Sequence, residues 1–121
     1  MLKSHIKILD TIWSKKVKEK AGYKCEVCLE EGVYLNSCHI IGRRYRATRW
    51  GAEIDGKYDL CGFSGCFGCH REYDEHSPKE DFIRRVVIGE ERYQKISEKA
   101  KQSVAKNQDF ETIKKELENA R

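Results

Sequence analysis

Two closely spaced cysteine pairs constrain the fold of this chain more than any other feature of its sequence. The first pair is Cys25 and Cys28, and the second is Cys66 and Cys69. Tetrahedral zinc sites take two such Cys-x-x-Cys pairs, with each sulfur about 2.3 Å from the ion. A redox-active pair would instead begin a helix after a buried strand, and the residues before Cys25 predict no such strand. The two pairs therefore predict one shared structural zinc.

The composition explains why such a site would matter for folding. Only 39% of the 121 residues are apolar and 36% are charged, which predicts a single domain, residues 1–121, with a small core. A structural zinc contributes on the order of 10 kcal/mol to folding and so compensates for a thin core. The N-terminus lacks the pattern of a secretion signal, and no apolar run approaches the roughly 20 residues that span a bilayer. We therefore expect a cytoplasmic protein without a membrane partner.

Residues 1–22 are predicted to form an N-terminal helix. Leu9, Trp13 and Val17 are spaced to lie on one helical face, and Gly22 follows as a stop. We expect this helix to pack on the small core through Trp13.

Residues 23–76 are predicted to form the zinc-bearing core around a β-hairpin. The first strand is expected at 33–41, interrupted near Asn36, and the second at 57–60. The connection between them, residues 42–56, contains three glycines and four arginines and is predicted to be a long basic loop.

Residues 77–121 are predicted to form the C-terminal helices. Ser77 can cap a helix that has a proline at its first position, and Glu80 completes a capping box. That helix should end at Gly89. Apolar stripes suited to packing or to a partner surface predict two more helices, at 90–104 and from Asp109 onward.

The long loop carries a cluster of arginines: Arg43, Arg44, Arg46 and Arg49. The net charge of +4 is a weak argument for a nucleic-acid partner, whereas a local arginine cluster is a stronger one. Guanidinium groups bind phosphate oxygens in pairs, and Tyr45 and Trp50 could add stacking on bases. The alternative is a solvated basic loop without a ligand.

Several motifs occur together in a characteristic order: Cys25-x-x-Cys28, His39-Ile40-Ile41-Gly42-Arg43, Arg49-Trp50 and Cys66-x-x-Cys69-His70. In this order and spacing, residues 20–76 resemble the HNH endonuclease superfamily, and most of all its small phage and prophage members. The resemblance implies an α+β fold with a zinc-held ββα-metal core, an N-terminal helix and two or three C-terminal helices. It also implies DNA, duplex or branched, as the partner and a phage or prophage origin.

The resemblance also implies roles for the histidines. His39 would be the general base that activates water, because an imidazole can accept a proton near neutral pH. His70 would ligate a catalytic Mg²⁺ or Mn²⁺ ion, which stabilises the phosphate charge and the leaving oxygen. His76 could complete that cation site, contact a phosphate or lie exposed before the Ser77 cap. The alternative is that His39 and His70 are purely structural.

The chain departs from the HNH pattern in three ways: the middle asparagine is missing, Cys38 occupies a ligand position, and the gap from Trp50 to Cys66 is longer. The middle asparagine that usually pins the loop between the strands is absent, and Asp55 or Asp59 could replace it. Cys38 stands where many members of the family carry an acidic or histidine ligand, but a thiolate suits Mg²⁺ poorly, and we interpret Cys38 as a buried, inert thiol. The second ligand would then come from Asp55, Asp59 or His76, or the enzyme would use a softer metal. Cys61 is an alternative to Cys66 as a zinc ligand, although the tighter Cys-x-x-Cys spacing favours Cys66.

The sequence leaves two functions open. The first is a metal-dependent, HNH-type DNA endonuclease that hydrolyses phosphodiester bonds. The second is a zinc-ribbon module that binds DNA without cleaving it, or an HNH protein with a degenerate site. The oligomeric state is also open, because the C-terminal helices could form a dimer.

Overall fold

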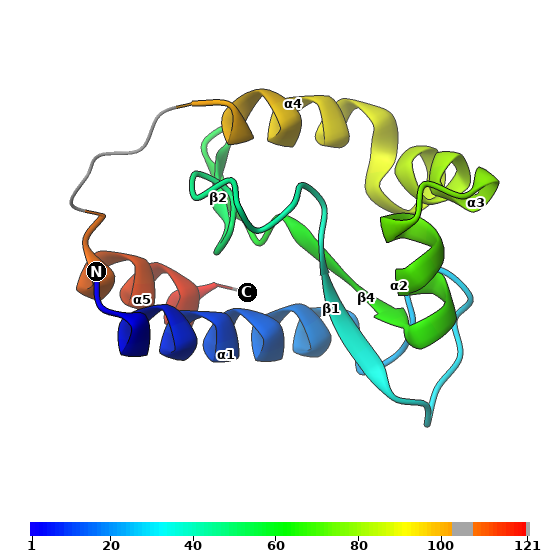
Figure 1. Cartoon of the computed structure of the whole chain (residues 1–121), viewed down its shortest axis with the longest axis horizontal. Helices are drawn as coiled ribbons and strands as arrows, with labels where there is room; N and C mark the ends of the chain where they lie inside the picture. Colours follow the sequence, from blue (N-terminus) through cyan, green and yellow to red (C-terminus); the bar gives the residue numbers. More distant parts are fainter. Residues whose placement is uncertain (103–107, 121) are drawn as a thin grey trace.

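The chain folds as an α+β protein in which two small antiparallel sheets lie between helices (Figure 1). A computed structural model describes residues 1–102 and 108–120. The α+β class predicted from the sequence is confirmed. In chain order the elements are α1 (Lys3–Lys20), β1 (Leu35–His39), β2 (Ala52–Ile54), β3 (Lys57–Asp59), β4 (Gly62–Cys66), α2 (Phe67–Asp74), α3 (Pro78–Phe82), the π-helical η1 (Ile83–Gly89), α4 (Glu90–Ala100) and α5 (Phe110–Asn119).

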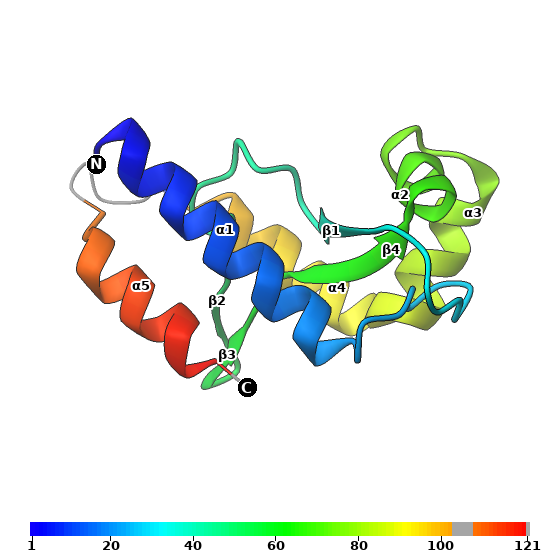
Figure 2. The ribbon, with the colours of Figure 1, turned by 90° about the horizontal axis from the view of Figure 1, so that it is seen from below.

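Helix α1 forms where the sequence predicts it. Leu9, Trp13 and Val17 are buried along one face, as their spacing requires. Gly22 follows the helix with a φ of +68°, a conformation that favours glycine and turns the chain away from the helix axis. Helix α5 packs beside α1, so segments from the two ends of the chain lie side by side (Figure 2).

The strand pairing differs from the prediction. The expected pairing of residues 57–60 with the first strand is wrong, because β1 pairs with β4 in an antiparallel sheet. Leu35 lies opposite Cys66, and His39 lies opposite Gly62. Helix α2 follows β4 directly, so two antiparallel strands and a helix form one continuous unit, with His39 at the end of its first strand.

The second sheet is a hairpin of β2 and β3 within and just after the segment predicted as a loop. Asp55 and Gly56 connect the two strands, and their φ angles are +52° and +79°. Positive φ at both central residues is what a type I′ turn requires, and such a turn joins two strands with only two residues. The strand at 57–59 is therefore paired locally and is not available to β1.

The C-terminal helices begin at the predicted cap. The Oγ of Ser77 accepts a hydrogen bond from the N–H of Lys79 at 3.2 Å. The predicted capping box does not form. The Glu80 carboxylate pairs with the imidazole of His76, and the Ser77 N–H donates to the carbonyl of Glu72 at 3.1 Å.

The remaining helices follow the predicted order. Helix α3 continues into η1, and Gly89, with a φ of +94°, separates η1 from α4. The helix expected at 90–104 is α4, which ends at Ala100; positions 103 and 104 lie outside the described residues. Asp109 caps α5 by accepting a hydrogen bond from the N–H of Glu111 at 3.3 Å. No helix in the described part of the chain has both the length and the apolar character that crossing a membrane requires.

Two groups of buried side chains fix the end of β1 in place. One packs β1 and β4 against α2, η1 and α4, and its members include Cys38, Phe63, Tyr73, Ile83 and Ile96. The other packs α1 against α5 and against residues that precede β2 and follow β3, and its members include Leu9, Trp13, Trp50, Leu60 and Leu117. The end of β1 therefore lies between α1 and α2, where side chains from both helices can reach it.

Candidate functional site

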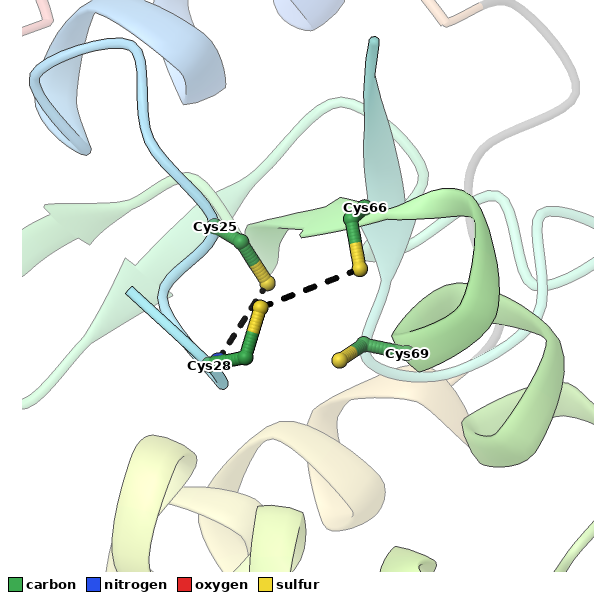
Figure 3. Close-up of side chains that lie close together, drawn as sticks. All are labelled: Cys25, Cys28, Cys66 and Cys69. Atoms are coloured by element: carbon green, nitrogen blue, oxygen red, sulfur yellow. Dashed lines mark hydrogen bonds between the residues drawn. The ribbon is translucent and has the colours of Figure 1, made fainter. Parts of the chain in front are cut away.

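The two cysteine pairs come together as a four-cysteine cluster, defined here as Cys25, Cys28, Cys66 and Cys69. The four sulfur atoms all lie within 4.8 Å of one another and point toward a common centre (Figure 3). The sulfurs of Cys28 and Cys66 are 3.9 Å apart. Tetrahedral coordination at about 2.3 Å per sulfur corresponds to a separation of about 3.8 Å, so the cluster could hold a metal ion such as zinc.

The local structure explains how the cluster is built. Cys25 and Cys28 lie on the turn that follows α1, Cys66 is the N-cap of α2, and Cys69 lies in the first turn of that helix. The cluster contains Cys66, as the sequence favoured, and not Cys61. Within the described residues it is also the sole group of three or more histidine, cysteine or acidic side chains close enough to share one ion.

The electrostatics of the four-cysteine cluster favour a bound cation. Burial raises the pKa of the Cys25 thiol, but backbone N–H groups of Cys28, Cys66 and Val27 outweigh burial and lower that pKa to about 7. Burial and the neighbouring sulfurs raise the pKa of Cys69 to about 12. The thiolate is the form that binds metal, and several thiolates this close repel one another unless a cation offsets their charge.

The two remaining cysteines are buried in the core. Cys38 is 0% exposed and Cys61 is 1% exposed. Burial raises the pKa of Cys61 to about 12 and raises the pKa of Cys38 further still. Both side chains are therefore protonated, unreactive thiols at neutral pH, which agrees with the interpretation of Cys38 as inert.

A cavity of about 800 Å³, here called the histidine cavity, lies beside the end of β1. It is formed by β1, the start of the following loop, α2 and the start of α3. Its polar lining includes five residues selected from the sequence: His39, Arg43, Arg44, His70 and His76. It also includes Asp74, which was not among the residues predicted from the sequence. Arg46 and Arg49 do not line it. The folded chain thus gathers the three predicted histidines and two of the four predicted arginines around one cavity.

His39 is held in a defined orientation. Its Nε2 lies 3.1 Å from the carbonyl oxygen of Arg49, and its ring stacks on the indole of Trp13 with centroids 4.0 Å apart. A carbonyl oxygen can only accept a hydrogen bond, so the neutral imidazole carries its proton on Nε2 and has a free lone pair on Nδ1. Burial lowers the pKa of His39 to about 4. His39 is therefore neutral at pH 7.

His70 and Asp74 form a pair one turn apart on α2. The Nε2 of His70 lies 2.9 Å from Oδ2 of Asp74. The hydroxyl of Tyr73 donates to the carbonyl of Ile40 at 2.6 Å, which ties this helix to the end of β1. Asp74 was not among the residues predicted from the sequence. Asp74 follows His70 by four residues, and in a helix that spacing places both side chains on one face. The contact between them needs a proton on Nε2, because a carboxylate oxygen accepts, so Nδ1 is the nitrogen of His70 that keeps a free lone pair.

His76 is the most exposed of the three histidines that line the cavity. Its side chain is 82% exposed and pairs with Glu80, and its φ is +55°. Of the three uses proposed for His76, the structure shows the exposed position before the Ser77 cap. A role in cation or phosphate binding stays a prediction.

The two aspartates proposed to replace the family asparagine have different partners. Asp59 accepts hydrogen bonds from Nε and Nη2 of Arg92, both at 2.8 Å, and from the N–H of Cys61 at 2.7 Å. Asp55 pairs with Lys95 of α4. A third carboxylate, Asp10 of α1, also contacts the loop after β1 and binds the side chains of Arg49 and Trp50.

The four arginines fall into two groups. Arg43 and Arg44 are exposed at the cavity, and Arg44 stacks on the ring of Tyr45 at 4.9 Å. Arg46 lies over the indole of Trp50 at 5.4 Å, and Arg49 is bound by Asp10. The expectation that Trp50 stacks on a base is wrong, because Trp50 is 2% exposed and belongs to the core around α1.

Comparison of the chain with protein-family models, with curated proteins and with solved structures found no match. The function therefore has to be argued from the chemistry of the site. That site combines a four-cysteine cluster suited to a metal ion with a cavity that contains a neutral, oriented imidazole, an imidazole–carboxylate pair and exposed arginines.

Proposed function

We propose that the chain is a metal-dependent DNA endonuclease of the HNH type. The observation that supports this most strongly is the orientation of His39. Its Nε2–H donates a hydrogen bond to the carbonyl oxygen of Arg49, with 3.1 Å between the nitrogen and the oxygen. The remaining nitrogen, Nδ1, is free to act as a base, and His39 lines the same cavity as His70 and the exposed arginines. Hydrolysis of a phosphodiester requires a base, a cation near the phosphate and a grip on the backbone, and each has a candidate here.

In the proposed reaction, Nδ1 of His39 takes a proton from the attacking water as that water approaches the phosphorus atom. Such general-base catalysis typically contributes about 10²- to 10⁴-fold to a rate. The stack on Trp13 and the hydrogen bond to Arg49 keep the ring in place, so little reorganisation is needed at the moment of reaction.

His70 and Asp74 are the residues that would hold the divalent cation, Mg²⁺ or Mn²⁺. A bound cation would supply positive charge to the phosphate and to the leaving oxygen. These two side chains are few for a complete site. Magnesium commonly retains several waters and is held by one or two carboxylates together with substrate phosphates, so Asp74 would be its principal protein ligand and His70 a secondary one.

The proposed function is tested with supercoiled and branched DNA incubated with the protein and Mg²⁺ or Mn²⁺. We expect nicking that requires the cation and that persists in His5→Ala. His5 lies near the N-terminal end of α1, where its ring stacks on Phe110, and it does not line the histidine cavity. It is therefore a matched control for substitutions of His39. DNA binding without cleavage under every cation would instead support a zinc-ribbon binding module.

Arg43 and Arg44 give a separate prediction about DNA affinity. If each contacts one phosphate, replacing both with alanine should reduce the slope of log affinity against log salt by about 1.8, because each phosphate contact contributes about 0.9. Fluorescence anisotropy over a salt series measures this slope. The matched double variant, Arg71→Ala with Arg85→Ala, removes two exposed arginines that do not line the cavity and should change the slope much less. Equal slopes for both variants would contradict the assignment.

A further inference from the structure

We propose that Asp10 is a positioning residue that holds His39 in the tautomer with a free Nδ1, acting through the backbone carbonyl of Arg49. This role presupposes the proposed function, because the orientation of the free nitrogen matters for catalysis when His39 is the base. Asp10 lies on α1, outside residues 20–76 whose motifs resemble HNH proteins.

Asp10 receives three hydrogen bonds from two consecutive residues of the loop. Its Oδ1 accepts from Nε of Arg49 at 3.1 Å and from Nε1 of Trp50 at 2.8 Å, and its Oδ2 accepts from Nη2 of Arg49 at 2.8 Å. The Arg49 side chain is 14% exposed. A guanidinium fork fits a carboxylate in one plane and one direction, so this pair fixes orientation as well as distance.

Arg49 links Asp10 to the imidazole. Its side chain is clamped by Asp10, and its own carbonyl oxygen accepts the hydrogen bond from Nε2 of His39 at 3.1 Å. The neighbouring indole of Trp50 is buried and also bound to Asp10, so the peptide on this side of the loop has little freedom to turn its carbonyl away. Loss of Asp10 should release that carbonyl and with it the preference for a proton on Nε2.

The ring of His39 is restrained a second time by the same helix. Trp13, three residues after Asp10 on α1, stacks on the imidazole with an interplanar angle of 10°. The indole N–H of Trp13 in turn donates to the carbonyl of Leu60 at 2.7 Å. Helix α1 therefore fixes both the face of the imidazole and the partner of its N–H group. The guanidinium of Arg49 thus serves the fold of the site, and a phosphate contact by its remaining N–H groups stays a prediction.

Asp59 provides a matched control for Asp10. It too accepts three hydrogen bonds, two from the guanidinium of Arg92 and one from the N–H of Cys61. That constellation connects α4 to the turn after β3 and does not include the carbonyl that binds His39. Asp10→Asn and Asp59→Asn make the same chemical change, and an amide has a single acceptor oxygen and cannot accept the whole guanidinium fork.

The first measurement is the tautomer of His39 by ¹⁵N NMR of the imidazole, without DNA or catalytic cation. We expect a single Nε2–H tautomer with a slowly exchanging proton in the unmodified protein and in Asp59→Asn. In Asp10→Asn, and in Arg49→Lys, which lacks the fork, we expect a mixture of tautomers and an Nε2 proton that exchanges up to about tenfold faster, as the weakening of one hydrogen bond allows. If Asp10→Asn is poorly folded, Arg49→Lys tests the same link.

The second measurement is DNA cleavage. We expect kcat to fall about 10- to 100-fold in Asp10→Asn with an unchanged KM, because a displaced base affects the reaction step and not DNA binding. Arg49→Lys should leave the salt dependence of DNA binding unchanged. An unchanged His39 tautomer and exchange rate in Asp10→Asn and Arg49→Lys, or equal losses in Asp10→Asn and Asp59→Asn, would overturn the role of Asp10. A protein that shows the tautomer effect but never cleaves DNA would keep the structural link and refute the nuclease.

Discussion

Removal of the metal from the four-cysteine cluster should unfold the segment that joins α1 to β1. Residues 21–34 form no helix or strand. An isolated β-bridge pairs Lys24 with Glu31 within this segment. Glu26 exchanges two hydrogen bonds with Ser64 of β4, at 2.8 and 2.6 Å, and Val27 packs against the core. A shared ion would add a further attachment, because two cysteines of this segment meet two cysteines of β4 and α2. A structural zinc contributes on the order of 10 kcal/mol, comparable to the whole stability of a typical domain, about 5–15 kcal/mol.

Cys28→Ser tests this prediction most sharply, because the Cys28 side chain is exposed and its substitution should cost little apart from the lost ligand. Metal analysis should give about one zinc per chain, and urea unfolding should show a large loss of stability in Cys28→Ser and in chelator-treated protein. After chelation, the unmodified protein and Cys28→Ser should be equally stable. An unfolding midpoint that a strong chelator leaves unchanged would contradict the metal site.

His39→Gln should lower kcat for DNA cleavage by about 10²- to 10⁴-fold with little change in DNA affinity. Glutamine cannot accept a proton, but its amide N–H can still donate to the carbonyl of Arg49, so the local structure is largely retained. Circular dichroism and zinc content confirm that the variant is folded. A fall in DNA affinity with unchanged kcat would instead assign His39 to binding.

The pH dependence of cleavage gives a second test of His39. Burial lowers its pKa to about 4, and the protonated imidazole cannot act as a base. Activity attributable to His39 should therefore persist through the usual histidine range near pH 6.5 and be lost as the pH falls toward 4. Below about pH 6.5 the unfolded chain binds a proton at this residue while the folded chain does not, so the fold also loses stability over this interval. His39→Gln should lack this pH-dependent loss of stability. A fall of kcat/KM with an apparent pKa near 6.5 would contradict a buried His39 as the base.

The features that the sequence predicted correctly depend on local spacing. The apolar face of α1 and the cap at Ser77 are set by residues within one or two turns of each other. The two Cys-x-x-Cys pairs likewise mark the four side chains that cluster, although Cys28 and Cys66 are 38 positions apart in the sequence. Metal-ligand spacing is a strong constraint because a tetrahedral site tolerates few alternatives.

The features that the sequence analysis missed have two causes. One signal was present but not used: Asp55-Gly56 is a strong two-residue hairpin turn, and it removes residues 57–59 from the pairing with β1. The other has no local signal. Asp10 and Arg49 are separated by 39 positions, so their pairing follows from how α1 packs against the loop and cannot be inferred from either segment alone.

The decisive measurement is nicking of supercoiled DNA by the unmodified protein, His39→Gln and His5→Ala, in parallel and with Mg²⁺ or Mn²⁺. We expect the unmodified protein and His5→Ala to nick DNA at similar rates when the cation is present, and His39→Gln to be at least about 100-fold slower while it retains its zinc and its affinity for DNA. Equal rates for His39→Gln and the unmodified protein, or DNA binding without nicking under either cation, would contradict the assignment of His39 as the base of a nuclease.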